Sequence, residues 1–164
     1  MILYIVRHGI AIGRGDPKAP GEAERPLSAE GVKKTRLAAL GLLAFKPKPD
    51  LLITSPYLRA AQTAEIFAEA LKFSPSKIRI MEALKPTGNP GEAIKELARL
   101  RTKEVMCFGH APHMDQMILL LAGARGVFTQ IKKAGVACFE HTPSRGKWEM
   151  LCLLAPKTLR QLAE

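Results

Sequence analysis

The stretch Tyr-Ile-Val-Arg-His-Gly, at residues 4–9, ends an apolar run that begins at Ile2 and is typical of a short buried strand. The run stops at Arg7, whose planar guanidinium matches phosphate oxygens, and at His8, whose imidazole can act as a nucleophile. Gly9 then lets the backbone turn sharply. Because open α/β sheets bind ligands at the carboxyl ends of their strands, the stretch predicts an anion-binding crevice. In isolation, a strand that ends in ordinary surface residues explains it equally well.

A second apolar run, at residues 50–54, is followed by Ser55-Pro56, a pair typical of a helix start with a capping side chain. Apolar residues then recur at helical spacing, and the predicted helix covers 56–71 with Tyr57 in its buried stripe. Arg59 lies near its first turn, where free N–H groups and the helix dipole favour an anion. The alternative for Arg59 is a solvated helix arginine. Gln62 and Thr63 follow on the same face, and nothing in the sequence requires chemistry of them.

A third strand, at residues 104–109, again ends in glycine and histidine, Gly109-His110, before a helix at 112–122. Each of these three signals is weak alone. Together they predict one crevice lined by two arginines and two histidines, a set of side chains that favours phosphate binding above other functions. The four residues are Arg7, His8, Arg59 and His110.

Strands and helices alternate along the whole chain, which predicts a three-layer α/β/α fold with a mostly parallel sheet of about six strands and an antiparallel edge strand. The remaining expected elements are helix 28–44, strand 77–82, helix 91–101, and strands 135–141 and 147–154. Residues 143–146 would close the last two strands as a hairpin, and a short helix would follow Pro156. The loop at 13–26 would flank the crevice.

Length and composition predict one domain over residues 1–164, with 47% hydrophobic residues available for a core. No apolar run approaches the ~20 residues of a membrane span, and the N-terminal run is unlike a secretory signal. The three cysteines are interpreted as buried free thiols of a cytoplasmic protein. The net charge of +10 raises the alternative of nucleic-acid binding. The basic residues are spread out without interleaved aromatics, so neither a nucleic acid nor a membrane is expected as a partner.

The chain resembles the histidine phosphatase (phosphoglycerate mutase-like) superfamily. The resemblance runs through Arg7-His8-Gly9, the segment 25–31 with Arg-Pro-Leu-Ser-x-x-Gly, the segment 55–63, and Gly109-His110. It covers nearly the whole chain in the expected order. Within the superfamily the chain is similar to the short SixA-type phosphohistidine phosphatases, and the segment 82–88 resembles a proline-and-glycine turn of those members.

The resemblance implies a phosphatase without cofactor or metal, in which His8 forms a covalent phosphohistidine that water hydrolyses. Its other ring nitrogen would donate to a backbone carbonyl near Gly9, while Arg7, Arg59 and His110 would hold the phosphoryl oxygens. The expected partner is a phosphorylated substrate, either a phosphohistidine protein or a small phosphoester. Phosphate, sulfate, vanadate and tungstate should bind at the same residues. A broad small-molecule phosphomonoesterase and a non-catalytic phosphoprotein-binding module on the same fold are the alternatives.

The acid that protonates the leaving group is the open point of this interpretation. Larger superfamily members carry a glutamate after the third strand, where the candidate proton donor here is Glu82, in uncertain register. A strand-end surface glutamate is an equally good interpretation of it. Glu22, Glu24 and Asp16 in the first long loop are weaker candidates. His113, at a helix start, is a further candidate for the crevice lining, with an ordinary helix histidine as the alternative.

Overall fold

A computed structural model of the chain describes residues 1–19, 21–126 and 129–164, apart from the side chain of Arg145. The core of the fold is a six-stranded sheet in the order β3-β2-β4-β1-β5-β6. Its strands are β1 (Ile2–Arg7), β2 (Leu51–Thr54), β3 (Ile78–Ile80), β4 (Glu104–Gly109), β5 (Val136–Thr142) and β6 (Lys147–Leu154). The helices are α1 (Ala29–Leu42), α2 (Leu58–Ala70), α3 (Pro90–Ala98), α4 (His113–Leu121) and α5 (Pro156–Gln161).

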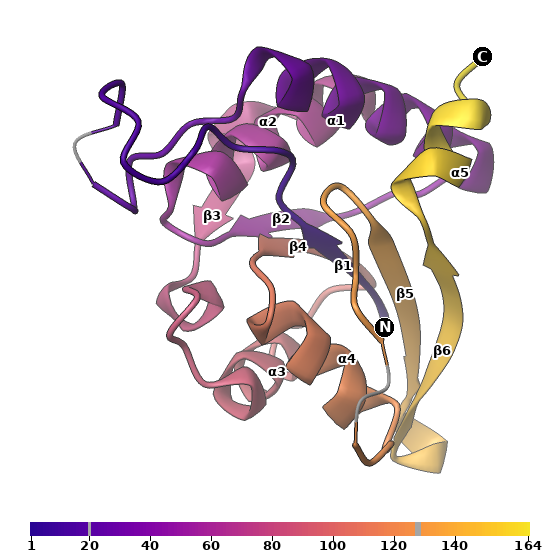
Figure 1. Cartoon of the computed structure of the whole chain (residues 1–164). Helices are drawn as coiled ribbons and strands as arrows, with labels where there is room; N and C mark the ends of the chain where they lie inside the picture. The colour runs from indigo at the N-terminus through magenta and orange to yellow at the C-terminus, as the bar shows by residue number, and fades with distance from the viewer. Residues whose placement is uncertain (20, 127–128) are drawn as a thin grey trace.

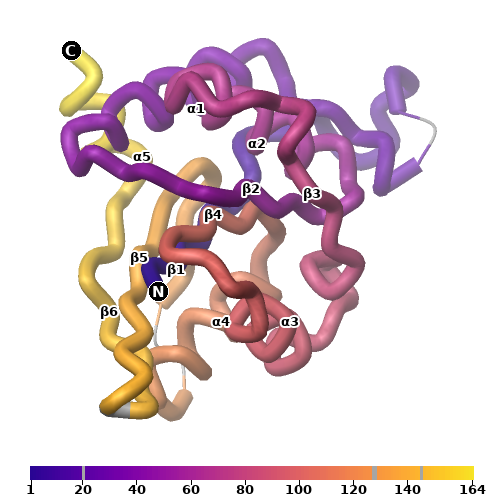
Figure 2. Tube along the Cα trace, turned by 180° about the vertical axis from the view of Figure 1, so that it is seen from behind, coloured from indigo at the N-terminus to yellow at the C-terminus, as the bar shows by residue number. Residues whose placement is uncertain are grey.

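The helices cover both faces of this sheet (Figure 1). Helices α1, α2 and α5 lie on one face, and α3 and α4 lie on the other, an arrangement that the opposite view in Figure 2 also shows. The predicted α/β/α layering is therefore confirmed.

Alternating side chains of the strands build a separate apolar core on each face. In β1, Tyr4 and Val6 pack toward α1 and α2, whereas Leu3 and Ile5 pack toward α3 and α4. This alternation follows from the two-residue period of a strand. Because helices cover both faces of the sheet, all residues of such a strand are buried, and its sequence is a continuous apolar run. Burial on both faces fixes the register, and the register positions the strand ends.

The sheet is parallel through its first four strands, because β1 and β2 each pair in parallel with β4, and β2 also pairs in parallel with β3. The antiparallel edge is the hairpin of β5 and β6, in which β5 pairs antiparallel with both β1 and β6. A 3-10 turn at Pro143–Arg145 closes this hairpin, and Gly146 follows it with a φ of 60°. A left-handed residue here suits glycine, as the sequence indicated.

Most predicted boundaries are off by one or two residues, and helix α3 ends at Ala98, three residues before the predicted end. Two differences lie close to the predicted crevice. Helix α2 begins at Leu58 and not at residue 56, because Tyr57 is still extended (φ −73°, ψ 132°) and occupies the position before the helix. Ser55 accepts a hydrogen bond from the Tyr57 N–H, so it closes a local turn and does not cap α2. Strand β3 ends at Ile80, because a 3-10 turn begins at Glu82.

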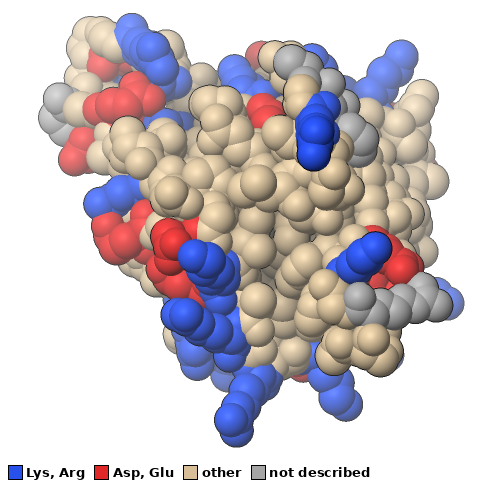
Figure 3. Space-filling view, turned by 90° about the horizontal axis from the view of Figure 1, so that it is seen from below, with Lys and Arg blue, Asp and Glu red and all other residues tan. Residues whose placement is uncertain are grey.

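Charged side chains on the α3–α4 side of the molecule lie mainly around a rim, with an uncharged centre (Figure 3). Basic and acidic residues are mixed on the left of this view, whereas lysines and arginines prevail along its lower edge. Among the described residues, no helix is long and apolar enough to cross a membrane.

Candidate active site

The strand register brings the three predicted strand ends together. Arg7 at the end of β1 lies opposite Gly109 of β4, and Thr54 at the end of β2 lies opposite Phe108. The backbone continues this pairing beyond the strands: the His8 N–H donates to the Gly109 carbonyl at 2.9 Å. Since β4 lies between β1 and β2, the segments after all three strands border one space at the carboxyl edge of the parallel sheet.

A crevice of about 330 Å³ occupies this edge. Cationic side chains dominate its lining, and a single carboxylate belongs to it. The lining residues are Arg7, His8, Ala11, Arg14, Glu22, Arg25, Tyr57, Arg59, Pro86, Thr87, His110, Ala111 and Lys133. The loop at 13–26 flanks the site as predicted. Such a concentration of fixed positive charge favours an anionic ligand.

His8 is held by a short hydrogen bond between its Nδ1 and the backbone carbonyl of Gly9, at 2.6 Å. A carbonyl only accepts hydrogen bonds, so Nδ1 carries the proton and Nε2 keeps its lone pair. Nε2 accepts a long hydrogen bond of 3.3 Å from Nε of Arg59. Burial lowers the pKa of His8 to about 3, and the positive charges of Arg59 and Arg7 act in the same direction. The imidazole is therefore neutral and oriented.

Arg59 enters from the first turn of α2 and is 4% exposed. Its two terminal nitrogens donate to the backbone carbonyl of Glu22 at 2.7 Å and to the Glu22 carboxylate at 3.0 Å. The guanidinium lies 5.1 Å from the centre of the Tyr57 ring. Hydrogen bonding to Arg25, together with the charge of Arg59, lowers the pKa of Glu22. Glu22 is thus an ionised partner that fixes Arg59 beside His8.

Arg7, at the end of β1, is anchored by one hydrogen bond, from its NH1 to the backbone carbonyl of Ile131 at 2.8 Å. Its Nε is buried and has no hydrogen-bond partner within the described chain. Burial lowers the pKa of this guanidinium, while Asp115 opposes the shift. Most donors of Arg7 are consequently free for an oxyanion.

His110 lies across the crevice from His8, with ring centres 5.0 Å apart. Its Nε2 lies 2.9 Å from the hydroxyl of Ser55, and its Nδ1 is buried with no partner in the described part of the protein. Burial lowers the pKa of His110 to about 2, helped by His8 and Arg59. The Tyr57 ring packs edge-on against the imidazole at 5.2 Å. His110 therefore has one ring nitrogen free to contact a ligand.

Helix α2 also holds the loops that carry these groups. The Thr63 hydroxyl accepts from the Gly9 N–H at 3.0 Å and donates to the Arg59 carbonyl at 2.7 Å. The Gln62 amide oxygen accepts from the Leu27 N–H at 2.7 Å. Arg59, Gln62 and Thr63 thus lie on one face of the helix, as predicted. Gln62 and Thr63 hold the backbone of neighbouring segments by hydrogen bonds, a structural role that the sequence did not reveal.

The structure does not place Glu82 among the residues that line the crevice. Its side chain is 70% exposed and forms an ion pair with Lys85, three residues further along the same turn. The segment reaches the crevice through Pro86 and Thr87 instead. The lining carboxylate is Glu22, one of the weaker candidates, while Glu24 and Asp16 lie outside the lining.

Some residues at the site could not be assigned from the sequence. Tyr57 was expected in the buried stripe of a helix, but it precedes the helix and its ring contacts the crevice. Ser55 was interpreted as a cap, yet its hydroxyl pairs with His110. Lys133, from the segment before β5, also lines the crevice but belongs to no recognisable sequence motif. His113 is not among the lining residues. Its side chain is buried, and this burial lowers its pKa.

Fold and site together define an α/β protein with a neutral, oriented imidazole in a cationic crevice that suits a phosphoryl group. Comparison with known families agrees: the model of the histidine phosphatase superfamily (branch 1) matches residues 3–87. The chain belongs to this superfamily and is a phosphatase.

Relatives extend the similarity over the full chain. An uncharacterized protein of Picosynechococcus is 33% identical over 97% of this chain and 99% of its own length. The phosphohistidine phosphatase SixA of Escherichia coli is 28% identical over 92% of this chain and 93% of its own length. A solved structure of the protein histidine phosphatase SixA with tungstate superposes with a TM-score of 0.84 at 25% identity, covering 97% of this chain and 99% of that one. The chain is thus SixA-like in sequence and fold.

Proposed function

We propose that the protein is a metal-independent protein phosphohistidine phosphatase that acts through a covalent phosphohistidine on His8. The observation that carries this proposal is the 2.6 Å hydrogen bond from Nδ1 to the Gly9 carbonyl. It leaves Nε2 unprotonated on the side of the ring where Arg59 lies, at 3.3 Å. A nucleophile in the correct tautomer beside fixed positive charge is what a phosphoryl transfer needs.

The reaction has two steps. In the first, the lone pair of His8 Nε2 attacks phosphorus, and the bond from phosphorus to the leaving group breaks with its electron pair on the leaving group. In the second, water attacks the same phosphorus, the P–N bond breaks, and its electron pair returns to Nε2 while phosphate departs. Arg7, Arg59 and His110 hold the phosphoryl oxygens throughout, because the transition state keeps its charge on them.

The leaving group decides the substrate class. Glu82 lies outside the crevice lining, and Glu22 is ionised by its arginine partners, so neither carboxyl is placed as a proton donor. An alkyl phosphate would then have to expel an alkoxide unaided. A phosphohistidine whose second ring nitrogen is protonated expels a neutral imidazole. The site therefore favours phosphohistidine over simple phosphoesters.

The comparisons support this choice of substrate and ligand. The similar protein of Escherichia coli is named a phosphohistidine phosphatase, and a similar solved structure contains tungstate. Phosphate, sulfate, vanadate and tungstate are the expected oxyanions at Arg7, His8, Arg59 and His110. The three cysteines are free thiols; Cys107 and Cys138 are buried as expected, whereas Cys152 is only partly buried. Free thiols are consistent with the proposed cytoplasmic location.

The test is a substrate panel measured with the wild-type chain and a His8→Ala variant. Phosphohistidine peptide and p-nitrophenyl phosphate should be hydrolysed far faster than glycerol phosphate, and His8→Ala should lose both activities while remaining folded. Substituting Arg7, Arg59 or His110 by alanine should each cost about 100-fold or more, the scale of one preorganised charge-stabilising group. Rapid hydrolysis of glycerol phosphate would favour a broad phosphomonoesterase, and binding without any turnover would favour a phosphoprotein-binding module.

A further inference from the structure

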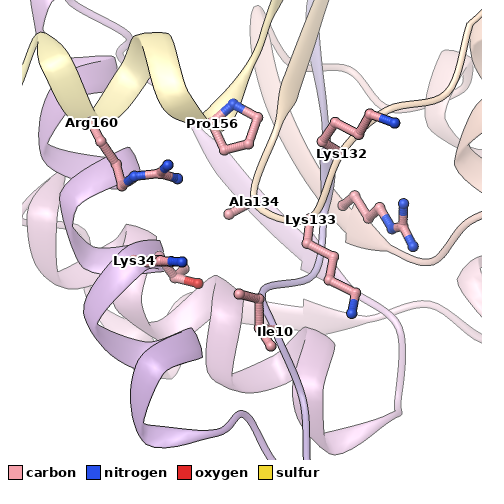
Figure 4. Close-up of a pocket in the computed structure, with 9 residues that line it drawn as sticks. Ile10, Lys34, Lys132, Lys133, Ala134, Pro156 and Arg160 are labelled. Atoms are coloured by element: carbon pink, nitrogen blue, oxygen red, sulfur yellow. The ribbon is translucent and has the colours of Figure 1, made fainter.

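A second cationic cavity, of about 390 Å³, lies next to the active-site crevice and shares Arg7 and Lys133 with it. Figure 4 shows this cavity between α1, α5 and the segment that leads into β5. Its lining residues are Arg7, Ile10, Lys34, Thr35, Lys132, Lys133, Ala134, Pro156 and Arg160. Apart from Arg7 and Lys133, its lining residues do not line the active-site crevice. We call it the α1–α5 cavity.

Close packing of the C-terminal helix on α1 builds this cavity. A Cβ at Gly41 of α1 would lie 1.7 Å from the carbonyl oxygen of Leu159, so only glycine permits this approach. Leu159 is fully buried and anchors α5. Arg160, the next residue, and Lys34 of α1 extend from the two helices into the same space (Figure 4). The packing of α5 on α1 thus places the side chains of Lys34 and Arg160 in the same cavity.

The charge of the α1–α5 cavity is strongly unbalanced. Five of its nine lining residues are lysine or arginine, and none is acidic. Lys34 forms an ion pair with Glu30 at the surface. Within residues 1–19, 21–126 and 129–164, Lys132, Lys133 and Arg160 form no ion pair. Like charges that are gathered with few counter-charges repel one another and attract anions, so the cavity is suited to an acidic group.

Two buried polar atoms on the cavity wall also lack partners. The Thr35 hydroxyl is fully buried and has no hydrogen-bond partner in the described chain, and the same holds for Nε of Arg7. Thr35 packs against the turn after β1, because a Cβ at Gly9 would lie 2.2 Å from its hydroxyl oxygen. Since buried polar groups are normally hydrogen-bonded, these two atoms leave hydrogen-bonding capacity unused in residues that line the cavity.

We propose that the α1–α5 cavity binds a carboxylate side chain of the phosphoprotein substrate while the substrate's phosphohistidine occupies the active-site crevice. This inference rests on the proposed function. Charge complementarity identifies the occupant as an anion. The shared wall of Arg7 and Lys133 identifies it as part of the same substrate, because one molecule spanning both hollows binds its second group at high effective concentration. A protein surface can present both groups, whereas a small aryl phosphate fills the crevice alone.

The test compares two double variants with equal charge. Lys34→Gln/Arg160→Gln removes two cations from the cavity. Lys33→Gln/Lys157→Gln removes two cations from the same two helices at exposed positions outside its lining. Both lower the net charge equally, so long-range attraction of an acidic substrate changes equally in both. The probes are a histidine-phosphorylated peptide flanked by glutamates, its glutamine-flanked counterpart, and p-nitrophenyl phosphate.

The wild type should prefer the glutamate peptide in kcat/KM. The cavity variant should lose about tenfold or more of that kcat/KM, mainly through KM, as expected for losing charged hydrogen bonds. It should keep its activity on p-nitrophenyl phosphate, and the Lys33/Lys157 variant should keep the preference. Equal losses in the two double variants, or no preference in the wild type, would overturn the proposal.

Binding of the unphosphorylated glutamate peptide, followed by fluorescence anisotropy, separates this proposal from the proposed function. Weaker binding to the cavity variant alone supports the carboxylate site even if neither phosphopeptide is hydrolysed, in which case only the proposed function fails. If inorganic pyrophosphate binds in a way that depends on Lys34 and Arg160 while the peptide does not, the occupant is a small free anion and the proposal is wrong.

Discussion

At His8, one hydrogen bond to the carbonyl of the following residue, Gly9, determines which ring nitrogen carries the proton. The Gly9 carbonyl takes the Nδ1 proton at 2.6 Å, and burial together with Arg59 and Arg7 disfavours a second proton. The hydrogen bond sets the tautomer, whereas burial and the two arginines keep the ring neutral, so Nε2 is unprotonated as the proposed nucleophile requires. In the proposed mechanism, the arginines would thus attract the substrate and also keep the nucleophile available.

The protonation state of His8 gives the first prediction. Its pKa is lowered to about 3, so the ring should remain neutral and Nδ1-protonated from pH 7 down to pH 5. An unperturbed histidine titrates near pH ~6.5. Titration of the side chains by NMR on 15N-histidine-labelled protein, with His8→Gln for assignment, measures this directly. Titration of His8 near its ordinary value would contradict the account.

The second prediction concerns the leaving-group acid. Glu82→Gln removes an exposed carboxylate whose partner is Lys85, and such surface ion pairs contribute little. Turnover of glycerol phosphate, whose alkoxide leaving group needs a proton, should therefore fall only modestly from its slow rate, well short of the ~10² to 10⁴-fold that a general acid contributes. Glu22→Gln should cost more, because the Glu22 carboxylate holds Arg59 at 3.0 Å. The reverse order, measured as kcat, would identify Glu82 as the acid.

At the scale of elements, α2 connects the parts of the site. Its first turn supplies Arg59, while Gln62 and Thr63 bond to the two ends of the loop that leaves β1. The helix therefore fixes the distance between the Arg59 guanidinium and the turn that orients His8. Displacing α2 would disturb both at once.

The third prediction follows from this connection. Thr63→Val keeps the shape of a fully buried side chain but leaves the Gly9 N–H without its acceptor. The free energy of unfolding should fall by about 1–3 kcal/mol, the cost of an unpaired buried donor, and kcat should fall with it. Thr35→Val is the matched control, because its buried hydroxyl has no partner among the described residues. Equal stability of the two variants in urea denaturation would contradict the role given to Thr63.

The sequence was sufficient to predict the order of elements and the residues at the strand ends. Apolar runs closed by Arg7-His8 and by Gly109-His110 are local signals, and parallel strands bring such signals to one edge. Contacts that depend on long-range geometry could not be predicted. Ser55 and Tyr57 meet His110 only because β2 lies beside β4. Glu22 reaches Arg59 from a loop whose path no periodicity reveals.

At the scale of the molecule, the buried imidazoles couple stability to pH. Burial lowers the pKa of His8, His110 and His113 in the folded chain. Below the ordinary histidine value, the unfolded chain therefore binds protons that the folded chain does not, and the free energy of unfolding decreases as the pH falls. The neutral buried histidines therefore lower the free energy of unfolding at acidic pH.

The fourth prediction is this acid sensitivity. The free energy of unfolding, measured by urea denaturation, should fall between pH 7 and pH 5, with a limiting slope of about 1.4 kcal/mol per pH unit for each buried histidine. The His8→Gln/His110→Gln variant should show a shallower decline over the same range. An unchanged slope in that variant would mean that other groups cause the pH dependence.

The central claim, a covalent intermediate on His8, is tested most directly by trapping it. The chain is mixed with a 32P-labelled phosphohistidine peptide, quenched in alkali within one turnover, and digested for peptide mapping. The account predicts alkali-stable, acid-labile phosphate on His8, reaching a level near one per active site, with no label in His8→Ala. Turnover without label on His8, or with label on another residue, would contradict it.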